Sequence, residues 1–442
     1  MLSSLRSLPS RLKSTLSPPA SFASSPPALS LPLSVSGNPS KAAGLLCLSS
    51  AAIVTGIVSV GGLTRLTKSG LSMTYWKPAQ ILPPQTLEEW TEEFDAYKAF
   101  PEFEQRRSMS LEEFKSIYYW EWGHRIMGRV AGMWYGVGLV GLFATGRVPK
   151  GYAPRLLGLF SLGGAQGAVG WWMVKSGLGD DRRGDRKEIR VTPYRLAAHL
   201  TTAFVTYAGL VWTGLELLCP EGERRRAAEL VRGKIEALSS PGARAQALQK
   251  LARFRSLALL STALTAVTVT SGAFVAGNDA GNAYNDWPYM NGRLVPWEDM
   301  IDTSGTDGPA YLNVFENTAF VQFDHRILAY ATSAAIASTA AYGAHARGAL
   351  EKLGLRVLSP QVTNGLRAMC ALAVCQVSLG ISTLVLYVPV HLAASHQLGS
   401  LALLTSGVFL TSSMRYIGMA VRRDVGKGER GVVGGAIKKS AQ

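Results

Sequence analysis

The clearest pattern in the sequence is a series of long apolar segments separated by polar loops. Four windows contain no Lys, Arg, Asp or Glu: 42–63, 256–277, 368–390 and 391–414. A helix of about 20 apolar residues crosses the roughly 30 Å hydrocarbon core of a membrane. Four further segments carry charge mainly near their ends: 118–145, 156–174, 196–218 and 317–344. The pattern therefore predicts an all-α membrane protein with eight transmembrane helices.

The charge of the loops predicts the orientation, because Lys and Arg favour the cytoplasmic or matrix side. One side of the predicted topology holds 27 Lys plus Arg against 7 acidic residues, in segments 1–41, 146–155, 219–255, 345–367 and 415–442. The opposite loops hold 12 against 20, in segments 66–117, 177–192 and 278–316. Both termini therefore face the basic side. The net charge of +15 is mostly a topology signal, and we infer no nucleic-acid partner from it.

Residues 1–41 are typical of a mitochondrial transit peptide. They are rich in Ser and Pro and carry Arg6 and Arg11, while the first acidic residue of the chain is Glu88. They lack the continuous apolar core of a secretory signal. We interpret them as a transit peptide or disordered leader, with a disordered cytosolic tail as the alternative. The basic side is then the matrix, and the chain lies in the mitochondrial inner membrane.

A weak internal repeat relates the two halves of the chain at a displacement of about 200 residues. His-Arg-Ile occurs at 124–126 and again at 325–327. The third and seventh spans carry Gln166 and Gln376, each followed by Gly four residues later. The repeat predicts two pseudo-symmetric four-helix bundles. The resulting divisions are a leader (1–41), an N-terminal bundle (42–218), a basic matrix linker (219–255), a C-terminal bundle (256–418) and a basic matrix tail (419–442).

Four of the six histidines lie near the start of every second apolar segment: His124, His199, His325 and His396. At 1.5 Å per residue, all four lie roughly 9 to 12 Å below the outer face. Ionisable groups inside a membrane are costly, and imidazole is a common axial ligand of haem iron. We predict two bis-histidine haem sites, one in each bundle, formed by His124 with His199 and by His325 with His396. A single such histidine would more often be a hydrogen-bonded core residue.

The repeat differs at one chemically important position. Glu121 lies three residues before His124, whereas Gln322 lies three residues before His325. The spacing places Glu121 on the same helix face as His124. We predict that it acts as an acid or base, or stabilises positive charge that develops on a substrate carbon. A buried ion pair with Arg125 or Arg129 is the alternative.

Arg125 and Arg326 each follow a predicted ligand directly. A guanidinium pairs well with a carboxylate, so we expect these side chains to contact haem propionates. Extension toward lipid headgroups is an equally good interpretation.

Several motifs together resemble the haem A synthases of mitochondria. They are the outer loop GGLTRLTKSGLSM, the Glu121-x-x-His124-Arg125 motif, AAHL around His199, FDHR around His325 and LAASHQ around His396. The resemblance covers about residues 42–418 and leaves the leader and the tail unmatched. Some bacterial members have a cysteine pair in outer loops, and this chain has none there.

The resemblance implies an oxidoreductase that converts haem O to haem A for cytochrome c oxidase, by oxidising the C8 methyl of the porphyrin to a formyl group. It implies that His325 and His396 hold a permanent haem B, and that His124 and His199 hold the substrate haem O beside Glu121. It also implies a ferredoxin-type electron donor. The basic matrix segment 223–255 is a plausible surface for an acidic partner. Haem O synthase, oxidase assembly factors and a second copy of the chain are further partners to consider.

Two other functions are compatible with parts of the pattern. A non-catalytic di-haem electron carrier of the cytochrome b type also pairs histidines across four-helix bundles, but it does not need Glu121. A transporter with inverted repeats places its site near the membrane midplane. Parallel repeats of four spans with sites near one face argue against a transporter.

Overall fold

The computed structural model describes residues 39–77, 81–179, 189–301 and 310–421. Apart from a single bridge between Met290 and Arg293, these ranges contain no β-structure. The long helices in them are α1 (Pro39–Leu66), α4 (Leu111–Ala144), α5 (Ala153–Lys175), α6 (Pro193–Leu218), α8 (Pro241–Gly277), α11 (Thr318–Lys352), α12 (Pro360–Val385) and α13 (Val390–Ser413). The short ones are α2 (Leu87–Lys98), α3 (Pro101–Glu104), α7 (Glu221–Glu236), α9 (Trp297–Ile301) and α10 (Asn313–Glu316), with 3₁₀ turns η2 (Ala280–Asn282) and η3 (Ala310–Leu312).

Each of the eight predicted apolar segments forms one of the long helices, so the all-α prediction is confirmed. Among the described residues, α1, α4, α8 and α12 are long and apolar enough to cross a membrane. The pair α6 and α7, bent by 74°, makes a fifth candidate if it counts as one span. The multi-pass membrane class follows from these helices. The number of eight spans stays a prediction.

Helix α4 begins earlier than its apolar segment, at Leu111 instead of residue 118. Ser110 and Glu113 form a reciprocal capping box, which satisfies two backbone N–H groups at the new start. The first turns of α4 pack Phe114 and Tyr118 into an aromatic cluster with Trp90 of α2 and its neighbours. Local capping and aromatic packing therefore extend this helix beyond the part that hydropathy predicts.

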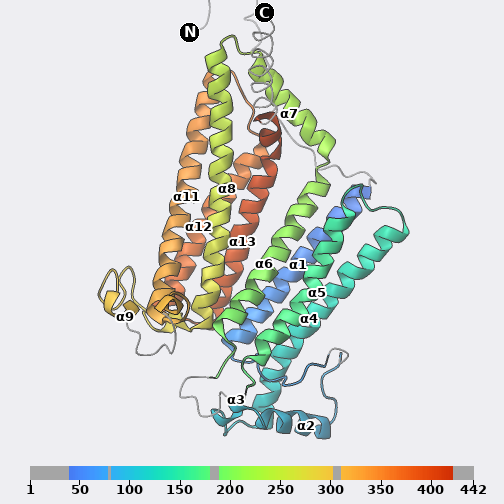
Figure 1. The fold of residues 1–442 in the computed structure, drawn as a ribbon, viewed down its shortest axis with the longest axis vertical. Coiled ribbons are helices and arrows are strands. Elements are labelled where there is room, and N and C mark those ends of the chain that lie inside the picture. The colour runs from blue at the N-terminus through green and yellow to red at the C-terminus, as the bar shows by residue number, and fades with distance from the viewer. Residues whose placement is uncertain (1–38, 78–80, 180–188, 302–309, 422–442) are drawn as a thin grey trace, which may run out of the picture.

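The helix contacts fall into two sets of four (Figure 1). In the N-terminal half, α1 packs on α4 and α6, and α5 packs on α6. In the C-terminal half, α8 packs on α11 and α13, and α12 packs on α13. Contacts of α6 with α8 and of α13 with α1 and α6 join the two sets. Helices α2, α3 and α9 gather at one end of the molecule, and α7 lies at the other end.

The segment 219–255, predicted as a linker, is largely helical. It forms α7 and the first turns of α8. Helix α7 buries Ala227, Val231 and Ile235, spaced four residues apart, against the core of the C-terminal half. Apolar residues at this spacing make one buried helix face. The predicted leader and tail lie almost entirely outside the described residues.

Two ion-pair clusters hold the halves together at opposite ends. At the end with α2 and α9, the Asp279 carboxylate binds Arg65 at the end of α1 (2.9 Å) and Arg190. At the other end, the buried Glu216 of α6 accepts from Arg155 of α5 (2.6 Å) and from Arg415, just after α13 (2.7 Å). Each cluster contains residues from both halves.

Close backbone approach holds α1 against α6. A Cβ atom added at Gly214 would lie 3.1 Å from the carbonyl oxygen of Gly44 and 2.6 Å from Leu48 Cγ. Lipid tails are as apolar as leucine, so helix association in membranes depends on such close packing by small residues.

We predict that Gly214→Leu destabilises the N-terminal half by roughly 1–3 kcal/mol, because the added side chain must push α1 away from α6. The measurement is the thermal melting temperature of the detergent-purified protein. Gly158→Leu is the matched control, since a Cβ atom at Gly158 meets no atom within 4 Å. Equal melting temperatures for the two variants would contradict the packing argument.

Candidate functional site

Each half of the structure contains one of the predicted histidine pairs. His124 and His199 lie on α4 and α6, and His325 and His396 lie on α11 and α13. In each pair, His124 with His199 and His325 with His396, the two rings lie near enough for a charge on one to oppose a charge on the other. The structure therefore brings the histidines together in the predicted combinations. Ligation of iron by these rings stays a prediction.

A glycine of a neighbouring helix lies against each of the four imidazole rings. The contacts are Gly61 of α1 with His124, Gly170 of α5 with His199, Gly272 of α8 with His325 and Gly380 of α12 with His396. A Cβ atom at these glycines would lie 2.6, 3.2, 3.2 and 2.9 Å from the ring Cε1, in that order. At these distances a Cβ atom would crowd the imidazole ring. The glycine therefore gives each ring room that a larger residue would reduce. The four contacts follow the internal repeat.

Polar groups also lie behind three of the rings, and the two glutamines among them follow the repeat. The Gln376 amide donates to the backbone oxygen of His396 (2.9 Å), and Gln166, with its amide oriented to satisfy both ends, donates to His199 Nδ1 (3.2 Å). Ser271 Oγ lies 2.7 Å from His325 Nδ1. A hydrogen bond to one ring nitrogen fixes the orientation of the imidazole and leaves the other nitrogen for a ligand.

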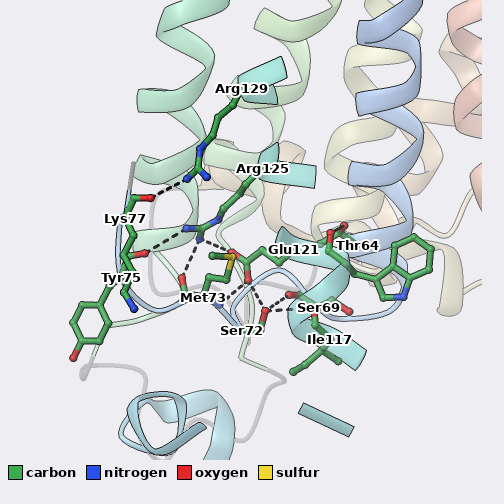
Figure 2. A network of polar contacts seen from close by, with 11 residues as sticks. Thr64, Ser69, Ser72, Met73, Tyr75, Lys77, Ile117, Glu121, Arg125 and Arg129 are labelled. Carbon is green, nitrogen blue, oxygen red and sulfur yellow. Dashed lines mark hydrogen bonds and ion pairs between the residues drawn. The ribbon is translucent and has the colours of Figure 1, made fainter. Parts of the chain in front are cut away.

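Glu121 is buried, with 3% of its surface exposed. Both oxygens of its carboxylate accept hydrogen bonds. Its Oε2 accepts from Ser72 Oγ (2.7 Å) and from the backbone N–H of Met73 (2.8 Å). Its Oε1 accepts from Arg125 (2.5 Å). Figure 2 shows this network between α4 and the loop. The ion pair with Arg125 that sequence reasoning kept as an alternative is therefore present.

Gln322, the corresponding residue of the other half, is also buried. It donates hydrogen bonds to its loop, whereas Glu121 accepts them from its own. Its Nε2 donates to the carbonyl oxygens of Ala280 (2.6 Å) and Tyr284 (3.4 Å). Its Oε1 accepts from Arg326 (2.9 Å). The loop of the N-terminal half offers N–H and O–H donors at this place, whereas the loop of the C-terminal half offers carbonyl acceptors. The difference between Glu and Gln therefore matches a difference in the loops as well as any difference in chemistry.

Arg125 and Arg326 have partners that the sequence did not reveal. Arg125 donates to the carbonyl oxygens of Met73 (3.0 Å) and Tyr75 (3.4 Å). Arg326 donates to three carbonyl oxygens of its own loop, those of Tyr284, Asp286 and Tyr289, at 2.8–3.0 Å. Both guanidiniums therefore fasten an outer loop to a histidine-bearing helix. Contact with haem propionates stays a prediction.

Sequence reasoning missed Gly61, Gly272, Ser72 and Ser271. The two glycines carried a usable signal, because they are 211 residues apart, close to the 201 residues between His124 and His325. Ser72 lies in the outer-loop motif GGLTRLTKSGLSM, but nothing in the motif singles it out, and no pattern marks Ser271.

Comparison with known proteins identifies the family. A model of the cytochrome oxidase assembly protein family (COX15-CtaA) matches residues 44–408. The chain belongs to this family.

Relatives in this family are similar over most of their length. Heme A synthase COX15 of Arabidopsis thaliana is 40% identical over 388 residues, which are 87% of this chain and 78% of the relative. Heme A synthase COX15 of Homo sapiens is 40% identical over 387 residues, 86% of this chain and 85% of the relative. A heme A synthase-mitochondrial ferredoxin fusion protein of Schizosaccharomyces pombe is 39% identical over 385 residues. This chain spans 60% of that fusion protein. The family match includes all four histidines and Glu121.

We predict that Gly61→Ala weakens haem binding in the N-terminal half, because the new methyl group displaces the His124 ring. Gly170→Ala should have a smaller effect, since its Cβ would lie 3.2 Å from the His199 ring instead of 2.6 Å. The measurement is a spectroscopic haem titration of purified protein, with Gly158→Ala as the control. Gly61→Ala with unchanged haem affinity would show that the ring–glycine contact does not position a ligand.

Proposed function

We propose that the chain is a haem A synthase that oxidises the C8 methyl of haem O to the formyl group of haem A. The proposal places the substrate between His124 and His199, and a resident haem B between His325 and His396. The observation that carries it is the pair of matched histidine sites, only one of which has a carboxylate three residues before its first histidine, in a chain about 40% identical to named heme A synthases.

The residues fit a porphyrin in each half. Each histidine ring sits in a glycine cradle that a Cβ would fill, and the Nδ1 atoms of His124 and His396 are buried without a hydrogen-bond partner. Ser271 fixes Nδ1 of His325, which leaves Nε2 of that ring for iron. A haem B held by His325 and His396 would supply electron transfer. The C-terminal site suits that role.

Glu121 distinguishes the substrate site. Its ion pair with Arg125 and its hydrogen bonds from Ser72 and Met73 hold the carboxylate in one position, so it needs no reorganisation during the reaction. A fixed negative charge three residues from His124 stabilises positive charge developing on the methyl carbon, or receives its proton. Gln322 supplies neither a negative charge nor a proton acceptor of this kind. This agrees with an electron-transfer role for the C-terminal half.

The same proposal includes the cellular setting. The candidate spans and the eukaryotic relatives fit a mitochondrial membrane protein. We place it in the inner membrane, with the haem sites toward the intermembrane space and both termini in the matrix. The fusion of a heme A synthase to a mitochondrial ferredoxin in Schizosaccharomyces pombe supports a ferredoxin-type electron donor.

We predict that Glu121→Gln abolishes haem A formation while the spectrum of the C-terminal haem is unchanged. The glutamine can still accept from Met73 N–H, but it carries no charge. The measurement is haem A content by pigment extraction from cells that express the variant in place of the wild type. Glu112→Gln, which removes an exposed carboxylate paired with Lys115, is the control. A normal haem A yield from Glu121→Gln would reject its assignment.

We further predict that His325→Ala depletes the purified protein of haem B, because the resident haem loses one axial ligand. His345→Ala is the matched control, since His345 is exposed and lies 3.1 Å from Lys250 Nζ, away from the pair. The pigment of the wild type separates the competing functions. Haem B with haem O or haem A supports a synthase, whereas two equivalents of haem B alone support an electron carrier. An undiminished haem B content in His325→Ala would reject that ligand.

A further inference from the structure

We propose that residues 72–77 form a releasable gate over the N-terminal histidine pair, through which haem enters and leaves. We call this segment the N-terminal strap. The corresponding segment of the other half, residues 284–290, is a fixed cover over the C-terminal pair, and we call it the C-terminal strap. The assignment of the gate to substrate exchange rests on the proposed function.

The N-terminal strap is fastened along one face of α4. Glu121, Arg125 and Arg129 are spaced four residues apart, so they form a row parallel to the helix axis. Arg125 binds the carbonyl oxygens of Met73 and Tyr75, and Arg129 binds that of Lys77 (2.9 Å). Figure 2 shows the strap lying along α4 with these side chains reaching it. The attachment to α4 is polar and repeated, as expected of the anchored side of a gate.

The strap spans from α4, which carries His124, to α5, whose Gly170 lies against His199. On α4 it is bound by Arg125, the residue after His124. On its other side Trp76 stacks on Trp171 of α5, with ring centroids 5.8 Å apart and planes inclined by 30°. Trp171 directly follows Gly170, the glycine against the His199 ring. The strap therefore lies across the side of the pair where α4 and α5 face each other.

The attachment to α5 differs in kind from the attachment to α4. In the described part of the chain, no hydrogen bond joins residues 72–77 to α5, and the Trp76–Trp171 stack is the ring contact between them. Arg125 adds a cation–π contact to the same ring, with Cζ 5.9 Å from the ring centroid. Stacking is weakly directional, and it can be broken without leaving a buried polar group unsatisfied. This side of the strap can therefore open at low cost.

The C-terminal strap is hydrogen-bonded to both helices that flank its pair. Arg326 of α11 binds its carbonyl oxygens, and Trp287 Nε1 donates to Tyr330 Oη of α11 (3.0 Å). On the opposite side, Asn285 Nδ2 donates to the carbonyl oxygen of Leu384 in α12 (2.8 Å). Leu384 lies one turn after Gly380, the glycine against the His396 ring. Releasing this strap from α12 breaks a directed hydrogen bond.

This asymmetry fits the different needs of the two sites. A substrate haem must exchange in every turnover, whereas a resident haem must stay. Segments that move during function are drawn from the least stable parts of a fold. The half with the carboxylate is also the half whose strap is held on one side by ring stacking.

The first test is hydrogen exchange of the full chain in lipid nanodiscs, followed by mass spectrometry of peptides that cover residues 69–77 and 281–291. We expect the N-terminal strap to exchange faster than the C-terminal strap, and added haem O to slow exchange in the N-terminal strap selectively. Equal exchange of the two straps, or faster exchange of the C-terminal strap, would overturn the proposal.

The second test is the rate of haem transfer to apomyoglobin. His325→Ala protein reports release from the N-terminal half and His124→Ala protein reports release from the C-terminal half, each loaded with haem B or haem O. Trp76→Ala should speed release from the N-terminal half about three- to tenfold, the range expected for losing an aromatic pair, and leave the C-terminal half unchanged. Asn285→Ala should do the reverse. Trp76→Phe keeps a stacking ring and should restore the slow rate. That result would show that the faster release in Trp76→Ala does not come from general unfolding.

Unchanged release from the N-terminal half in Trp76→Ala, or equal acceleration in both halves, would overturn the gate. Failure of the proposed function looks different. In that case the wild-type chain forms no haem A, whatever the release rates of its two halves.

Discussion

The contact between each imidazole ring and a glycine of the adjacent helix is the constraint on which the rest of the structure depends. Two helices that carry facing histidines must leave room for a ring on each side, while the other helices still pack closely enough to be stable in lipid. Glycine leaves the most room for both, because a Cβ at these positions would fall within 2.6–3.2 Å of the ring. The same contact occurs four times, twice in each half.

The outer loops are attached to the helices that carry the first histidine of each pair. In both halves an arginine directly after the first histidine binds loop carbonyls, so each loop is held beside its pair. The residue three positions before the histidine then completes the same network, as an acceptor in Glu121 and as a donor in Gln322. Glu121 and Gln322 therefore differ both in charge and in the way they attach the neighbouring loop. The charge near the histidine and the attachment of the loop depend on the same side chain.

Much of this architecture could be predicted from the sequence. Apolar windows located all eight long helices, and the His-Arg-Ile repeat indicated which histidines share a bundle. The early start of α4 could not be read from hydropathy, because the Ser110–Glu113 capping box and the aromatic cluster set it. The loop partners of Arg125 and Arg326 are backbone carbonyls, which every residue has, so no residue pattern marks them. The helical character of 219–255 was hidden by its charge, although its buried Ala, Val and Ile follow helical spacing.

The central claim is that each half clamps one porphyrin between its two histidines, and that the N-terminal half holds the one that is transformed. Electron cryo-microscopy of the full chain in nanodiscs with added haem O tests it most directly. The account predicts planar density between His124 and His199 that carries an isoprenoid tail, and tail-free planar density between His325 and His396. Planar density outside both pairs, or the tailed haem in the C-terminal half, would contradict it.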